Sequence, residues 1–223
     1  MINQIKGAIF DMDGTLIDSL MLWDIIWEAF GKKYGVDNFR PSDEADKAIR
    51  TMTLKDGMKM IYDQYGIGES GEELLEEANR IIREFYCEKV QLKAGVRDFL
   101  DNCRSRGIKM CIASATGPKL LQCAIDHCEI GHYFSDVLSC ATIGKGKDQP
   151  EIYLAAMQRF GTSLDDTCVF EDSAVAIDTA HKIGMKTVAI YDKFNYGQEQ
   201  MKATADAYIA DGESLMKLVA KKQ

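Results

Sequence analysis

The stretch that decides the fold is IKGAIFDMDGT, residues 5–15. Its first six residues form a short apolar run that is typical of a buried β-strand, and the run stops abruptly at Asp11. Gly14 then allows the chain to turn sharply. In an open parallel sheet, ligands bind outside the carboxyl ends of the strands. Asp11 and Asp13 are therefore placed where a binding site would form.

The remainder of the chain mostly alternates short apolar runs with amphipathic helical patterns. Such alternation predicts an α/β fold with a Rossmann-like parallel sheet and helices on both faces. Further strands are expected at residues 108–113, 136–140, 167–170 and 186–190, with a short last strand at 207–209. Helices are expected around residues 96–103, 119–128, 150–160 and 174–183, and again from Glu213.

One long stretch departs from this alternation. Residues 19–90 contain no convincing strand, and apolar side chains recur there at helical spacing within residues 22–30, 54–65 and 74–85. We therefore expect a catalytic core made of residues 1–17 and 92–223, with residues 18–91 inserted as an α-helical cap domain. Because the chain would cross between the two domains at two adjacent points, this arrangement predicts a hinge and a cap that opens and closes.

Composition excludes several classes of partner. The chain has 223 residues and a formal net charge of −8, which disfavours nucleic acid and anionic membranes as partners. Its apolar runs are too short to cross a bilayer. The first residues show no signal-peptide pattern. We expect a cytoplasmic protein that acts on a small molecule, with a monomer as the default state.

The residues that follow the other expected strands complete a possible reaction site. Ser114 follows the strand at 108–113, Lys147 lies in the loop after 136–140, and Glu171 and Asp172 follow 167–170. A carboxylate such as Asp11 can attack phosphorus and form an acyl phosphate. Asp13 can protonate the leaving oxygen and then deprotonate the attacking water. The order of these groups therefore suits phosphoryl transfer.

Several carboxylates would repel a phosphate group unless a cation lay between them. Asp11, Asp172 and Glu171 offer the hard oxygen ligands that Mg²⁺ prefers. Lys147 supplies further positive charge, and Ser114 can hold phosphate oxygens. Each piece also has an ordinary structural interpretation: a solvated turn for the two aspartates, a helix N-cap for Asp172, a surface position for Lys147. The functional interpretation rests on all of them following strands.

The same residues resemble the motifs of the haloacid dehalogenase superfamily, in the branch with an α-helical cap. The matching segments are DMDGT with Asp18 and Ser19, IASAT around Ser114, GKGKDQPEIY around Lys147, and VFEDS around Asp172. The chain is similar to β-phosphoglucomutase-like and phosphoglycolate-phosphatase-like proteins. The resemblance implies Mg²⁺ as cofactor, Asp11 as nucleophile, and Asp13 as acid/base with its backbone carbonyl on the metal.

The function that follows is hydrolysis of a small phosphorylated metabolite through an aspartyl phosphate. We expect Gly14, Thr15 and Ala115 to line the substrate site, with Trp23 and Arg50 contributing from the cap. The alternative is a sugar phosphomutase of the β-phosphoglucomutase type. Those mutases carry a histidine at the position matching Trp23, and because an indole cannot transfer a proton as histidine does, hydrolysis is favoured. A catalytically idle phosphate-binding module is the alternative of another class.

Overall fold

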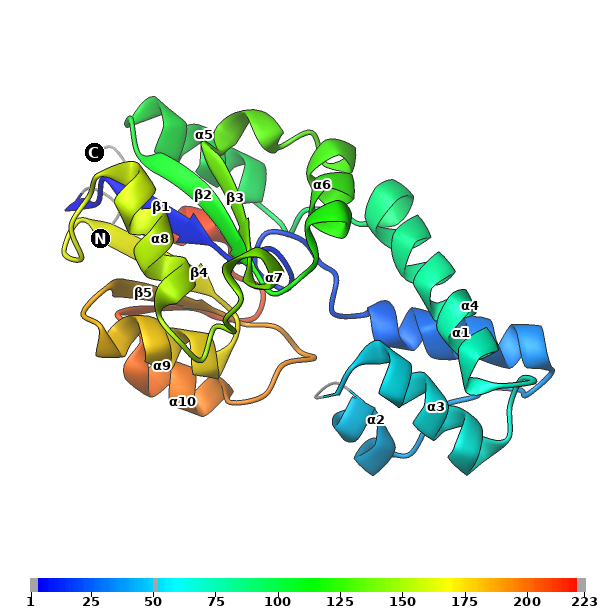
Figure 1. Ribbon diagram of the computed structural model, residues 1–223. Helices are drawn as coiled ribbons and strands as arrows, with labels where there is room; N and C mark the ends of the chain where they lie inside the picture. Colours follow the sequence, from blue (N-terminus) through cyan, green and yellow to red (C-terminus); the bar gives the residue numbers. More distant parts are fainter. Residues whose placement is uncertain (1–3, 50–51, 220–223) are drawn as a thin grey trace. The chain divides into compact units, whose positions relative to one another are not determined.

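The computed structural model describes residues 4–49 and 52–219 (Figure 1). The chain divides into two compact units. Residues 1–20 and 90–223 form the first unit, and residues 21–89 form the second. That the second unit acts as a cap stays a prediction.

A six-stranded parallel sheet forms the centre of the first unit, in the order β3-β2-β1-β4-β5-β6. This is the strand order of a doubly wound Rossmann-like fold, and the order reverses between β1 and β4, where such sheets open a crevice for ligands. The prediction of the fold class is confirmed. The strands are β1 (Gly7–Phe10), β2 (Lys109–Ser114), β3 (Asp136–Ser139), β4 (Thr167–Glu171), β5 (Lys186–Ile190) and β6 (Ala207–Ile209).

Alternate residues of β1 face opposite layers of the unit, as the period of a strand requires. Ile9 belongs to a buried cluster with residues of α8 (Glu151–Phe160) and α9 (Ala174–Lys182). Phe10 faces the other way, where its ring stacks on Phe170 at 4.5 Å between centroids. It also meets the edge of Phe99 from α5 (Val96–Ser105) at 6.2 Å. Helices therefore cover both faces of the sheet (Figure 1).

The first unit contains further helical segments. They are α6 (Pro118–His127), α7 (Cys140–Ile143), α10 (Gln198–Thr204) and the 3₁₀ turns η3 (Gly131–Tyr133) and η4 (Leu215–Leu218). The prediction of a helix from Glu213 is wrong for the described residues, because residues 213–219 form the 3₁₀ turn η4 and no α-helix. Ser214 caps this turn by accepting a hydrogen bond from the backbone N–H of Met216, and Glu213 instead accepts one from Ala210.

The second unit consists of helices joined by loops, with no strand in the part that the structure describes. Its elements are α1 (Leu22–Tyr34), α2 (Asp43–Ile49), α3 (Leu54–Tyr65), α4 (Gly71–Glu84) and the π-helical turn η2 (Phe85–Lys89). Apolar side chains from α1, α3 and α4 pack into one cluster that includes Trp27, Phe30, Met58 and Leu74. These side chains lie on the helix faces that the apolar spacing predicts. The helix α2 has too few buried residues to give such a pattern.

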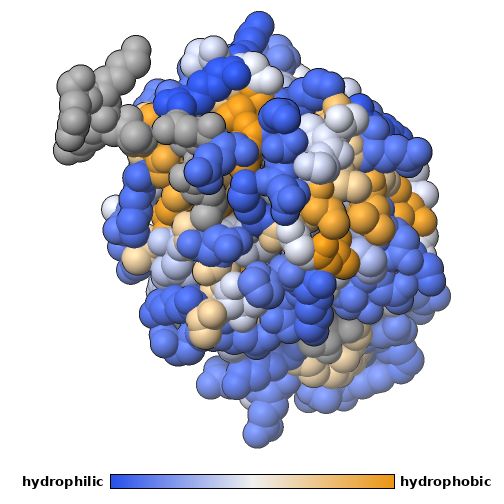
Figure 2. All heavy atoms as spheres, turned by 90° about the vertical axis from the view of Figure 1, so that its left-hand side faces the viewer, coloured by the Kyte–Doolittle hydropathy of each residue, from blue (hydrophilic) through white to orange (hydrophobic). Residues whose placement is uncertain are grey.

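None of the helices in the described residues is long and apolar enough to cross a membrane. Figure 2 shows the face of the molecule on the left-hand side of Figure 1, where the strand β1 begins. Hydrophilic residues cover most of this face, and smaller hydrophobic patches lie between them.

Candidate active site

The carboxyl ends of β1 and β4 bring together two segments that are far apart in the sequence. Phe10 and Phe170 are paired in the parallel register, so the residues that follow them emerge side by side. The backbone N–H of Asp11 donates a hydrogen bond to the carbonyl of Phe170 at 2.9 Å. This is the point where the strand order reverses, and there Asp11 lies beside Glu171 and Asp172.

Three carboxylates form one buried cluster at this point. Asp11, Glu171 and Asp172 each offer an oxygen, and these oxygens lie within 4.8 Å of one another. All three side chains are buried. The ammonium group of Lys147, on the loop between α7 and α8, contacts both Asp11 and Glu171. The ordinary interpretation of Lys147 as a surface residue is therefore wrong, since its side chain is only 11% exposed.

One lysine does not compensate three buried carboxylates. Burial raises the pKa of Asp11 well above its usual value; Lys147 opposes this shift, and Glu171 and Asp172 add to it. Burial, followed by the charge of Glu171, likewise raises the pKa of Asp172 to about 8. Burial alone would lower the pKa of Lys147, but Asp11 and Glu171 raise it overall, so this lysine stays charged. Buried, closely spaced carboxylate oxygens with excess negative charge fit a hard divalent cation such as Mg²⁺.

The three carboxylates differ in how many hydrogen bonds and ion pairs they already make with protein groups. Glu171 accepts hydrogen bonds on Oε2 from the backbone N–H groups of Asp172 and Ser173, at 3.1 and 3.2 Å, and meets Lys147 with Oε1. Asp172 is not the N-cap of α9, because that position belongs to Ser173. Asp11 and Asp172 therefore have more capacity than Glu171 to ligate a cation directly.

The side chain of Asp13 lies outside this cluster and is held by two hydroxyl groups. Ser19 donates to Oδ1 and Thr116 donates to Oδ2, both at 2.7 Å. Thr116 lies two residues beyond Ser114, on the segment that follows β2. The two hydroxyl groups fix the orientation of a carboxylate that is only partly buried, which a proton-transfer group at the edge of a site requires.

Gly14 lies directly against Asp172 of the carboxylate cluster. Its φ is +73°, and a Cβ atom added there would lie 2.1 Å from Oδ2 of Asp172. Glycine at this position allows the turn and also leaves room for Asp172.

The other residues expected at the substrate site differ in their burial and surroundings. Ser114 is buried at the end of β2, and its Oγ accepts a hydrogen bond from the backbone N–H of Thr116 at 3.0 Å. Ala115, next to it, is exposed. Thr15 is buried and lines a separate cavity.

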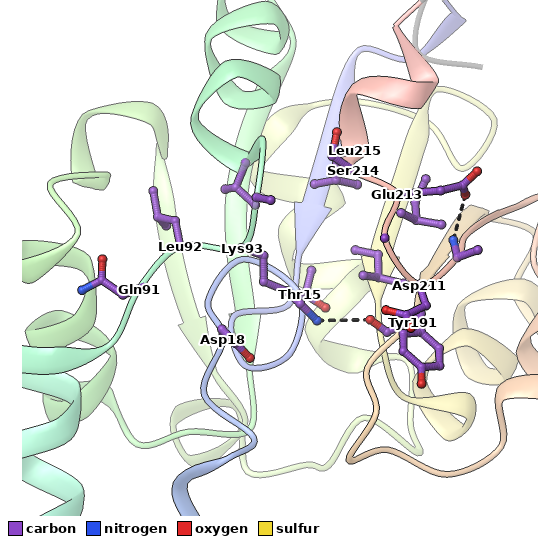
Figure 3. A pocket seen from close by; sticks show the side chains of 16 residues that line it. Thr15, Asp18, Gln91, Leu92, Lys93, Tyr191, Asp211, Glu213, Ser214 and Leu215 are labelled. Atoms are coloured by element: carbon purple, nitrogen blue, oxygen red, sulfur yellow. Dashed lines mark hydrogen bonds between the residues drawn. The ribbon is translucent and has the colours of Figure 1, made fainter.

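That cavity, of about 320 Å³, lies in the first unit beside the loop that follows β1 (Figure 3). Thr15, Lys93 and Tyr191 are among its lining residues, whereas Asp11, Asp13 and Asp172 are not. Thr15 therefore lines a space separate from the carboxylate cluster.

Two of the expected residues, Trp23 and Arg50, were predicted to contribute from the cap. Trp23 is half-buried on α1 and stacks on Trp27, with ring centroids 5.5 Å apart, at the edge of that unit's apolar cluster. Arg50 lies outside the described residues. A substrate-binding role for either stays a prediction.

Two side chains near the site were missed from the sequence. Lys93 donates to the carbonyl of Gly14 at 2.6 Å and forms an ion pair with the buried Asp192 at 2.8 Å. Asn195, on the loop after β5, donates to both the carbonyl and Oδ2 of Asp172 at 2.8 Å. The available signal was the position of Asp192 and Asn195 on the loop that follows the strand predicted at residues 186–190.

The structure combines a doubly wound α/β sheet with a buried carboxylate cluster at the point where the strand order reverses. The chain belongs to the haloacid dehalogenase-like hydrolase family, whose model matches residues 8–190. The resemblance noted from the four motifs is thereby confirmed, as is the prediction of a hydrolase.

Individual relatives agree with this assignment. The chain is 24% identical to a phosphorylated carbohydrates phosphatase of Thermotoga maritima over 94% of this chain and 96% of that protein. It is 27% identical to hexitol phosphatase B of Escherichia coli, over 84% of each chain. A crystal structure from Thermotoga maritima, described as a "putative beta-phosphoglucomutase", matches with a TM-score of 0.80 at 24% identity, covering 92% of this chain and 94% of that one. At this identity the structural match supports the fold.

Proposed function

We propose that this chain is a Mg²⁺-dependent phosphatase that hydrolyses a small phosphorylated carbohydrate or related metabolite through an aspartyl phosphate on Asp11. The observation that carries the proposal is the buried cluster of Asp11, Glu171 and Asp172, in which Lys147 contacts Asp11 and Glu171. Beside it, the carboxylate of Asp13 is held by hydroxyl groups. The names of the Thermotoga maritima and Escherichia coli relatives support the class of substrate.

In this proposal the charged groups of the chain hold the phosphoryl group for attack. Asp11 attacks phosphorus, and Lys147, already in contact with it, stabilises negative charge on the phosphoryl oxygens. Mg²⁺ held by Asp11 and Asp172 would supply the positive charge that the cluster lacks. Ser114, the last residue of the neighbouring strand β2, would bind a phosphoryl oxygen in this proposal.

Asp13 carries the proton in both halves of the reaction. It protonates the oxygen that leaves phosphorus when Asp11 attacks, and it then removes a proton from the water that hydrolyses the aspartyl phosphate. The hydrogen bonds from Ser19 and Thr116 keep its carboxylate in one orientation through both steps. The leaving alcohol departs first, and water replaces it as the acceptor of the phosphoryl group.

A screen of phosphate esters with and without Mg²⁺ tests the proposal. We expect Mg²⁺-dependent release of phosphate from at least one sugar or sugar-alcohol phosphate, and none from Asp11→Asn. Asp148→Asn, which changes an exposed carboxylate next to Lys147, should keep the activity of the unmodified protein.

Other outcomes would assign a different function. Conversion of β-glucose 1-phosphate to glucose 6-phosphate, with little release of phosphate, would identify a mutase. Binding of phosphate without turnover of any ester would identify an idle module. Substantial hydrolysis by Asp11→Asn would exclude Asp11 as the nucleophile.

A further inference from the structure

We propose that Asn195 is the positioning residue of Asp172: its amide fixes the carboxylate so that one oxygen faces the cation site. This inference rests on the proposed function, because it concerns the metal carboxylate of that same site. The proposal concerns a residue of the β5–α10 loop, which carries none of the four motifs recognised in the sequence.

One nitrogen of Asn195 makes two contacts with the same residue. Nδ2 donates to the backbone carbonyl of Asp172 and to its Oδ2, both at 2.8 Å. A bridge between the backbone and the carboxylate of one residue restricts both side-chain torsions of Asp172. It also engages Oδ2 and leaves Oδ1 as the oxygen for a cation.

The chemistry of the partners determines the orientation of the amide. Both atoms of Asp172 that Asn195 contacts are acceptors, so the nitrogen must point toward them. The amide oxygen of Asn195 accepts a hydrogen bond from the backbone N–H of Tyr196 at 3.1 Å, which requires the same orientation.

The loop that carries Asn195 is anchored on both sides of it. Asp192 pairs with Lys93 and accepts a hydrogen bond from the backbone N–H of Phe194 at 3.0 Å. On the other side, a Cβ atom added to Gly197 would lie 2.7 Å from the Cβ of Ala174, so the loop closely approaches the start of α9. The amide is therefore held in place before any cation binds.

Gln198 offers a matched control from the same region. Its Nε2 donates to the backbone carbonyls of Asp192 and Asn195, at 2.9 and 3.3 Å. Gln198→Ala removes an amide that supports the loop but contacts no carboxylate of the cluster. Asn195→Ala removes the amide that contacts Asp172. Comparing the two variants separates positioning of Asp172 from general ordering of the loop.

The experiment measures Mg²⁺ binding by isothermal titration calorimetry without substrate. Asn195→Ala should bind Mg²⁺ about 10–100-fold more weakly than the unmodified protein, which is the usual effect of removing a partner that orients a metal ligand. Gln198→Ala should stay within about twofold. In steady-state assays, Asn195→Ala should need more Mg²⁺ for half-maximal activity, while kcat at saturating Mg²⁺ largely recovers. Circular dichroism checks that each variant is folded, and Asn195→Ser provides a second variant if alanine disturbs the loop.

Unchanged Mg²⁺ affinity in Asn195→Ala would overturn the proposal. Equal weakening in Asn195→Ala and Gln198→Ala would also overturn it, because loop order alone would then explain the effect. If the unmodified protein binds no Mg²⁺, the metal site of the proposed function fails, and this inference fails with it. That result differs from the case in which the unmodified protein binds Mg²⁺ and Asn195→Ala binds it equally well.

Discussion

Gly14 and Asp172 approach each other so closely that no side chain fits at position 14: a Cβ atom there would lie 2.1 Å from Oδ2 of the aspartate. The two residues are brought together by the pairing of β1 with β4. The loop that carries Asp13 therefore packs directly against the carboxylate of Asp172. A change in either should affect both.

Gly14→Ala should weaken Mg²⁺ binding and lower kcat, because the added methyl group displaces Asp172. It should also cost about 1–2 kcal/mol of stability, since alanine is strained at positive φ. Gly107→Ala is the control: its φ is +72°, and nothing lies within 4 Å of an added Cβ. Unfolding in urea should show that Gly107→Ala loses stability, and calorimetry should show that it keeps the Mg²⁺ affinity of the unmodified protein. Equal Mg²⁺ affinity in the two variants would contradict the predicted clash.

Thr116→Val should lower kcat about 10–100-fold, because it removes a hydrogen bond to a charged carboxylate that is worth about 1.5–3 kcal/mol. Thr116→Ser keeps the hydroxyl group and should restore most of the activity. Thr179→Val, which removes a hydroxyl group bound to the carbonyl of Val175 within α9, is the control for loss of a buried hydrogen bond. A fully active Thr116→Val would show that Asp13 does not depend on this contact.

Lys93→Met should destabilise the first unit by about 3 kcal/mol, because it leaves the buried Asp192 without its cation. The double variant Lys93→Met, Asp192→Asn should recover a large part of this loss, as measured by urea unfolding. Lys6→Met serves as the comparison, since Lys6 is 72% exposed in its pair with Asp166 and such surface pairs contribute at most about 1 kcal/mol. Strictly additive losses in the double variant would show that Lys93 and Asp192 are not coupled.

The stability of the metal-free protein should depend on pH through Asp172. Its pKa is about 8 in the folded protein, against a usual value of 3.8. Between these values the folded state holds a proton that the unfolded chain has lost, so the contribution of Asp172 to stability falls as the pH rises through this range.

Asp172→Asn removes this titration and supplies the comparison. In unfolding experiments with a chelator, its advantage over the unmodified protein should be small near about pH 5 and should grow by at least about 1 kcal/mol toward about pH 8. Addition of Mg²⁺ should raise the Tm of the unmodified protein but not that of the variant. An advantage that shrinks as the pH rises would contradict the direction of the pKa shift.

Sequence reasoning located best the elements that have strong local hydrophobic patterns. The strand expected at residues 5–10 occurs as Gly7–Phe10, and α1 ends before Gly35 as the glycine indicates. Short polar segments were harder to predict. α2 (Asp43–Ile49) buries only Ala45 and Ile49 among its described side chains, so its pattern is too brief to distinguish a helix from a loop.

The sequence by itself determined the α/β fold and the identity of the charged groups at the strand ends, because apolar periodicity is local and each motif follows its own strand. Only the tertiary structure decided which partner holds each carboxylate. Thr116 reaches Asp13 across 103 positions, and Asn195 reaches Asp172 across 23. Such contacts depend on the register of the parallel strands and on the conformations of the loops after them. Local patterns do not encode these features, since they arise when distant segments pack together.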